Sequence, residues 1–168
     1  LVATGDFRHI KYTTDFQLAK NFLELLLSAF SIEKKDTFFV PGNHDVNQYK
    51  SRMEHINDIC LHTNDNYNIY SNYMLCKGFG DYDAFVRGFY GDSNITDMRI
   101  LEPSGVHCIK WNDLINILFV NTALISDGEN HEQIIDITSL SKCKIDFSSP
   151  TIMIGHHGID SLYDSHAE

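Results

Sequence analysis

The chain has few cysteines, and their spacing restricts the class of protein. Four cysteines are spread irregularly over 168 residues, and none forms a Cys-x-x-Cys pair. This spacing is not typical of a small secreted domain stapled by disulfides, so we expect reduced thiols and a cytoplasmic protein. The four are Cys60, Cys76, Cys108 and Cys143.

Positive charge is also scarce. The chain has 13 Lys and Arg against 23 Asp and Glu, which gives a formal net charge of -10. Non-specific affinity for nucleic acid comes mainly from clustered Lys and Arg, so a nucleic-acid partner is possible but not favoured. An acidic protein can still act on phosphates where a metal supplies the positive charge locally.

Long apolar runs and repeats are lacking as well. No run approaches the roughly 20 residues that span a bilayer, so we expect no membrane-spanning segment. With 43% hydrophobic residues, the chain is long enough for one buried core and short for two. We therefore expect a single domain over residues 1 to 168, and the sequence leaves its oligomeric state open.

The first 40 residues predict a strand, a helix and a second strand. An apolar segment at residues 1 to 4 and a β-rich run at residues 37 to 40 each end at a turn. Between them, Thr14 and Gln17 have the spacing of a capping box that starts a helix. This order implies a parallel strand pair with a crossover. The predicted apolar face of the helix consists of Ala19, Phe22, Leu23, Leu26, Ala29 and Phe30.

The middle of the chain predicts two further helices around an irregular segment. Residues 48 to 62 and residues 81 to 90 have helical apolar spacing. The second of these helices is expected to bury Phe85, Val86 and Phe89. Residues 64 to 73 are rich in Asn and Tyr without a sustained period, which indicates a surface excursion that could cover a site.

The last part predicts short strands. Strands are expected at residues 98 to 101, 106 to 111 and 114 to 120, with Asn112-Asp113 joining the last two as an antiparallel hairpin. Residues 131 to 144 favour a helix. A final apolar strand is expected at residues 151 to 154.

Metal-capable side chains follow three of these predicted strands. Asp6, Asn43 with His44, and His156 each come directly after an apolar run and a small residue. Loops at the carboxyl ends of strands converge over a rigid base, so these side chains could meet in space.

The side-chain types at these positions suit divalent metals. Carboxylate, amide oxygen and imidazole together suit Mn²⁺, Fe, Zn²⁺ or Co²⁺, and no thiolate is offered. Two such ions about 3.5–4 Å apart can clamp a phosphate and lower the pKa of a bridging water.

These segments resemble the motifs of the calcineurin-like metallophosphoesterases. Residues 40 to 45, Val-Pro-Gly-Asn-His-Asp, are similar to the family's GNHD motif, and Gly5-Asp6 resembles its GD motif. Residues 155 to 157, Gly-His-His, resemble its later histidine motif. The resemblance implies an α/β fold in which a two-sheet β-sandwich is flanked by helices.

The resemblance also implies roles for the individual residues. Asp6 would bridge two divalent metal ions, and Asn43 and His156 would ligate the second ion. His44 would hydrogen-bond the phosphate or protonate the leaving oxygen, with Asp45 holding its other ring nitrogen. The outer shell would include His9 and His157.

Two family motifs do not accompany these matches. The family's Asp-x-His motif does not precede Gly5-Asp6, and its Gly-His-x-His motif does not follow His157. We therefore expect a piece of a longer protein, truncated at both ends.

The sequence leaves the function between two main hypotheses. The first is hydrolysis of a phosphomonoester or phosphodiester through a metal-bridged hydroxide, with a nuclease as a variant of it. The second is a catalytically incomplete binding or regulatory domain of the same fold.

For each motif an ordinary structural reading competes with the functional one. Gly, Asn and Asp all favour turns, and Gly-Asp after a strand is common. The order of the three motifs along one chain favours the functional reading.

Overall fold

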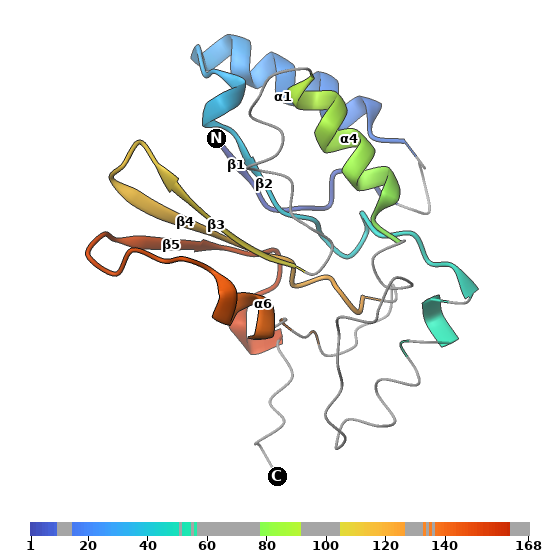
Figure 1. The fold of residues 1–168 in the computed structure, drawn as a ribbon. Coiled ribbons are helices and arrows are strands. Elements are labelled where there is room, and N and C mark those ends of the chain that lie inside the picture. The colour runs from blue at the N-terminus through green and yellow to red at the C-terminus, as the bar shows by residue number, and fades with distance from the viewer. Residues whose placement is uncertain are drawn as a thin grey trace.

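The computed structural model describes residues 1–9, 15–50, 52–54, 56, 78–91, 105–126, 133, 135 and 137–161. These residues contain a two-stranded sheet and a three-stranded sheet, with helices α1 and α4 beside the first sheet (Figure 1). The predictions of an excursion at residues 64 to 73 and of a strand at residues 98 to 101 lie outside the described residues.

The predicted parallel pair at the start of the chain is confirmed. Strand β1, Val2–Ala3, pairs in parallel with β2, Phe38–Phe39. Helix α1, Gln17–Phe30, connects them, followed by a 3-10 turn at Lys34–Asp36. Because both strands run the same way, the loops that follow them leave from one edge of the sheet.

The buried face of α1 differs from the predicted one. Leu23 and Leu27 are buried, whereas Phe22 and Phe30, both predicted to face inward, are 61% and 70% exposed. The helix carries two apolar stripes, and the stripe that meets Phe39 is the one that is covered. The predicted cap Thr14 lies outside the described residues.

The predicted helix near residues 81 to 90 is confirmed as α4, Gly80–Tyr90. It buries the three expected side chains and also two tyrosines, and all pack with α1 and Phe39 in one aromatic-rich cluster. The side chains that α4 buries are Tyr82, Phe85, Val86, Phe89 and Tyr90.

The three-stranded sheet is formed by the end of the chain. The predicted hairpin is confirmed as β3, Val106–Trp111, antiparallel to β4, Ile115–Val120. Asn112 and Asp113 have φ angles of 51° and 59°, which are the angles that a two-residue type I′ turn requires.

The final strand and the last helix complete this part of the structure. The predicted strand near residues 151 to 154 is confirmed as β5, Thr151–Ile154, and it pairs in parallel with β4. Helix α6, Ile137–Lys142, lies within the segment predicted to be helical. A 3-10 turn follows at Ile159–Ser161.

Strand β2 separates two layers of the core. Phe39 packs against the helices, and its neighbour Phe38 packs against the second sheet, because successive strand side chains point to opposite faces. The cluster between the sheets contains Phe38, Val40, Ile109, Ile117, Phe119 and Ile154.

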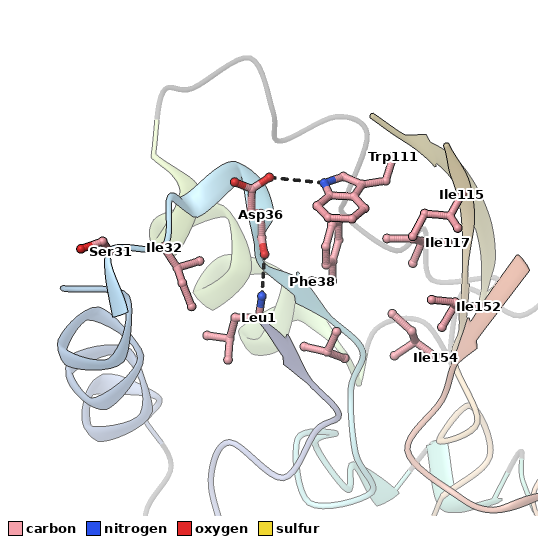
Figure 2. Close-up of a pocket in the computed structure, with 11 residues that line it drawn as sticks. Leu1, Ser31, Ile32, Asp36, Phe38, Trp111, Ile115, Ile117, Ile152 and Ile154 are labelled. Carbon is pink, nitrogen blue, oxygen red and sulfur yellow. Dashed lines mark hydrogen bonds between the residues drawn. The ribbon is translucent and has the colours of Figure 1, made fainter. Parts of the chain in front are cut away.

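An apolar pocket of about 420 Å³ opens between the sheets (Figure 2). Phe38, Trp111 and Ile152 are among its lining residues, and the indole of Trp111 donates a hydrogen bond to Asp36 at 3.3 Å. The lining includes the residues that begin β1, β2 and β4, the segment that precedes β2, and Trp111, which ends the antiparallel strand β3. The pocket is therefore at the opposite end of the strands from the metal-capable side chains.

Among the described residues, no helix combines the length and the apolar character needed to cross a bilayer.

Candidate metal centre

The carboxyl ends of β1, β2 and β5 bring three metal-capable side chains together. The Nε2 atom of His156 lies 3.1 Å from the Oδ1 atom of Asn43 and 3.6 Å from the Oδ1 atom of Asp6. The three residues lie far apart in the sequence, and each is brought here by the strand that it follows. Their predicted convergence is therefore present in the structure.

The ring of His156 is oriented by the backbone. Its Nδ1 atom hydrogen-bonds the carbonyl oxygen of Thr4, on the chain leaving β1. A carbonyl oxygen only accepts, so Nδ1 carries the proton, and in the neutral ring Nε2 keeps its lone pair. A backbone carbonyl holding the distal nitrogen is the usual second contact of a metal-binding histidine.

With this ring neutral, three electron-pair donors face one another. A cation with ligand bonds of about 2.1 Å separates neighbouring ligands by roughly 3.0–3.4 Å. The separations of 3.1 and 3.6 Å around Nε2 are close to that range. The donor set of this cluster fits a divalent metal ion.

Two glycines allow the loops after β1 and β2 to touch. Gly5 has a φ of 91°, and a Cβ atom added to it would lie 2.2 Å from the backbone nitrogen of Gly42. A Cβ atom on Gly42 would lie 2.3 Å from Oδ1 of Asp6. Neither position has room for a side chain, so both glycines are required for the close approach that sets Asp6 beside Asn43.

Asp45 has a different role from the predicted one. Its carboxylate is fully buried and accepts the backbone N–H groups of Asp6 at 2.7 Å, Gly42 at 2.9 Å and Arg8 at 3.3 Å. The expected pairing with the ring of His44 is therefore replaced by contacts to the backbone. A buried carboxylate needs several donors, and the two glycine-containing turns offer theirs at this point.

The pKa of Asp45 reflects these opposing influences. Burial raises the pKa of this carboxyl to about 6, while the N–H donors of Gly42, Asp6 and Arg8 act in the opposite direction. The charge of Asp6 adds to the upward shift.

His44 and His9 lie together beside Asp6. The backbone N–H of His44 donates to Oδ1 of Asp6 at 3.1 Å. Its ring stacks on the ring of His9, with centroids 4.4 Å apart and planes inclined by 20°. The two imidazoles therefore form a pair at the edge of the cluster.

The ring of His157 lies edge-on to the ring of His156, with centroids 4.7 Å apart, and contacts Thr122 in the loop after β4. The hydroxyl of Thr122 accepts the backbone N–H of His157 at 3.0 Å and lies 3.0 Å from its ring Nδ1. Burial, reinforced by the neighbouring His156, lowers the pKa of His157. The contact joins the loop after β4 to the loop after β5.

The comparison with known proteins follows the same motifs. The family model described as calcineurin-like phosphoesterase matches residues 1–168. The chain belongs to this family. It is also 25% identical over 182 residues to the uncharacterized metallophosphoesterase-like protein YydB of Bacillus subtilis (strain 168). All of this chain and 36% of that relative are covered, so the chain spans about a third of its length. No solved structure matches the chain.

Membership in the calcineurin-like phosphoesterase family implies divalent metal ions. Within the described ranges, no three His, Cys, Asp or Glu side chains gather around one point. The cluster found here has Asn43 as its third member, and an amide oxygen is a ligand that hard and borderline cations accept.

Three contacts at this candidate site were not expected from the sequence. They are the carbonyl of Thr4, the buried side chain of Arg8 and the hydroxyl of Thr122. A backbone carbonyl leaves no sequence signal, and arginine is usually exposed. Thr122 is the second residue after β4, so its position near the strand end was the one available sign.

Proposed function

We propose that this chain contributes part of a dinuclear metal site at which the protein hydrolyses a phosphomonoester or a phosphodiester. The observation that supports this most directly is the convergence of His156 Nε2 with the Oδ1 atoms of Asn43 and Asp6. We place the site at one end of a two-sheet β-sandwich flanked by helices. Other residues of the protein would complete the ligand set.

The proposed ligand roles are those that the resemblance to the family implies. Asp6 would bridge two ions, while Asn43 and His156 would hold one of them. Bound ions of the Mn, Fe, Zn or Co type supply charge stabilisation for the phosphate and acidify water. The protein contributes by fixing the donors, which the Thr4 carbonyl does for His156 and the backbone N–H of His44 does for Asp6.

His44 would act on the substrate. Its backbone is held by Asp6, and its ring is left to contact a phosphate oxygen or to give a proton to the leaving oxygen. His9 covers one face of that ring and would limit its orientations. Asp45 would serve the site by holding the two loops together.

Hydrolysis can be tested on the protein produced with its flanking sequence. The assay uses p-nitrophenyl phosphate and bis-p-nitrophenyl phosphate with added Mn²⁺. General acid catalysis typically contributes about 10²–10⁴-fold, so His44→Ala should lower kcat by at least about 100-fold. Asp6→Asn and His156→Gln should weaken both turnover and Mn²⁺ binding.

A matched control is available at the other end of β4. Asp113 is exposed in the hairpin turn, and asparagine tolerates its positive φ. Asp113→Asn removes one carboxylate far from the site and should leave turnover unchanged. Decreases in kcat of less than about tenfold in folded His44→Ala and Asp6→Asn would contradict the mechanism. Mn²⁺ binding without hydrolysis would favour a regulatory binding domain instead.

A further inference from the structure

The buried guanidinium of Arg8 joins three separate segments. Its side chain has no exposed surface, and it also lies over the ring of Phe16, 4.8 Å from the centroid. It donates to the carbonyl oxygens of His44 at 3.4 Å and Asp45 at 3.3 Å, and to Oδ1 of Asn47 at 2.6 Å. All three acceptors belong to the loop that follows β2.

A third segment balances the charge of Arg8. Asp81, in the first turn of α4, lies 3.4 Å from the guanidinium and also accepts a hydrogen bond from Asn47 at 2.8 Å. A fully buried cation requires such a partner and several acceptors. Arg8 is therefore paired at the helix end and hydrogen-bonded at the loop.

The contacts of Arg8 and Asp45 are reciprocal. The backbone N–H of Arg8 donates to the Asp45 carboxylate, and the Arg8 side chain donates to the Asp45 carbonyl. Asn43 and His44 lie between Gly42, whose N–H is held by Asp45, and this carbonyl. The part of the loop that carries the metal-capable amide is thus fixed on both sides.

We propose that Arg8 is a positioning residue for metal binding, which sets the amide of Asn43 against Asp6 through the backbone of the loop. This inference rests on the proposed function. Among the described contacts, Arg8 reaches the loop of Asn43 through the carbonyls of His44 and Asp45 and contacts none of the three metal-capable side chains. Without the guanidinium, those carbonyls and the Asn47 amide lose a buried donor, and the loop must move to reach water.

Lysine cannot replace Arg8 in this arrangement. One ammonium is a compact point charge, whereas the planar guanidinium reaches acceptors on separate segments at once. Loss of an outer contact that orients a ligand typically weakens metal affinity by 10–100-fold, so Arg8→Lys should weaken Mn²⁺ binding by about tenfold or more. Asn47→Ala removes one acceptor and should weaken binding by about three- to tenfold.

The test is a Mn²⁺ titration of the folded, metal-free protein with its flanking sequence. The concentration of free Mn²⁺ is measured from its electron paramagnetic resonance signal, and the dissociation constant is obtained from it. Thermal unfolding of the same metal-free samples is measured in parallel. A purely structural role lowers the melting temperature and leaves the dissociation constant of the folded protein unchanged. Asp83→Asn is the control, because among the ion pairs of the described residues Asp83 contacts only the exposed Arg87, one turn further along α4.

The results distinguish a positioning role of Arg8 in metal binding from a purely structural role. Weakening in Arg8→Lys and Asn47→Ala, with Asp83→Asn unchanged, supports the inference. A dissociation constant within about twofold of wild type in folded Arg8→Lys overturns it, since outer contacts normally cost more than that. If Arg8→Lys does not fold, Asn47→Ala decides by the same criterion. Wild-type protein that binds no Mn²⁺ overturns the proposed function itself.

Discussion

The two sides of the candidate site are held in different ways. On the side of β1 and β2, Asp6 and Asn43 sit on loops that are joined by the fully buried groups of Asp45 and Arg8. On the side of β5, the His156 side chain is 19% exposed and is oriented by one backbone carbonyl. Its neighbour His157 is tied to Thr122 alone among the described hydrogen bonds.

This difference indicates which half of the site is held in place by the protein without a metal ion. Buried hydrogen-bond networks are costly to break, whereas a partly exposed contact can be exchanged for water. We infer that the loops after β1 and β2 are set before any metal binds. The histidine side should gain more order from the ion.

The largest effect on stability is expected at Asp45. Asp45→Ala leaves three backbone N–H groups without their acceptor, and each buried unpaired donor costs about 1–3 kcal/mol. The free energy of unfolding of the metal-free protein should fall by on the order of 3 kcal/mol or more, as measured by urea denaturation. A loss of less than about 1 kcal/mol would show that the loops after β1 and β2 are not held in place before metal binds.

A methyl group at Gly42 should displace side chains on both sides of the site, Asp6 on one and His156 on the other. Its Cβ atom would lie 2.3 Å from Oδ1 of Asp6 and 2.9 Å from Cε1 of His156. Overpacking of this kind costs about 1–3 kcal/mol, and Gly42→Ala should also abolish tight Mn²⁺ binding. The measurement is urea unfolding together with Mn²⁺ titration.

Gly88 provides the matched control for that substitution. It lies inside α4, is exposed, and has nothing within 4 Å of an added Cβ. Gly88→Ala should therefore stabilise the protein by about 0.5–1 kcal/mol. Equal effects at Gly42 and Gly88 would contradict the close approach of the two loops.

On the histidine side, a smaller effect is expected from Thr122. Thr122→Val removes the hydroxyl that contacts His157 twice and should cost about 1 kcal/mol. Thr122→Ser keeps the hydroxyl and should retain the imidazole signals of His157 in nuclear magnetic resonance spectra. A Thr122→Val spectrum with unchanged His157 signals would mean that the contact does not hold the ring.

The smallest effect is a pH dependence from His157. Its pKa is lowered in the folded state from the ordinary value of 6.5, so the unfolded chain binds the proton more strongly. The contribution of neutral His157 is thus present above pH 6.5 and is lost as pH falls through the folded pKa. In metal-free protein, His157→Gln should reduce the drop in melting temperature between pH 7 and pH 5. An identical drop in both proteins would exclude His157 as its source.

The same contrast explains what could be predicted from the sequence. The hairpin at Asn112-Asp113 and strand β5 follow from local patterns of turn and apolar residues, and the structure has both. The buried face of α1 was predicted incorrectly at Phe22 and Phe30. Two apolar stripes compete on that helix, and the choice depends on how Phe39 and α4 pack.

For the site, the strand-end donors were predictable and their supports were not. Asp6, Asn43 and His156 carry their chemistry in the side chain and follow apolar runs. Arg8 has the appearance of a surface residue in the sequence, and the carbonyl of Thr4 has no side-chain signature. Their roles arise only when segments distant in the chain are brought together.

The most direct test of the central claim is anomalous diffraction at the manganese edge from crystals of the protein soaked in Mn²⁺. The account predicts a peak bonded at about 2.0–2.3 Å to an Asp6 carboxylate oxygen, Asn43 Oδ1 and His156 Nε2. A manganese position that lacks Asn43 and His156 as ligands would contradict it.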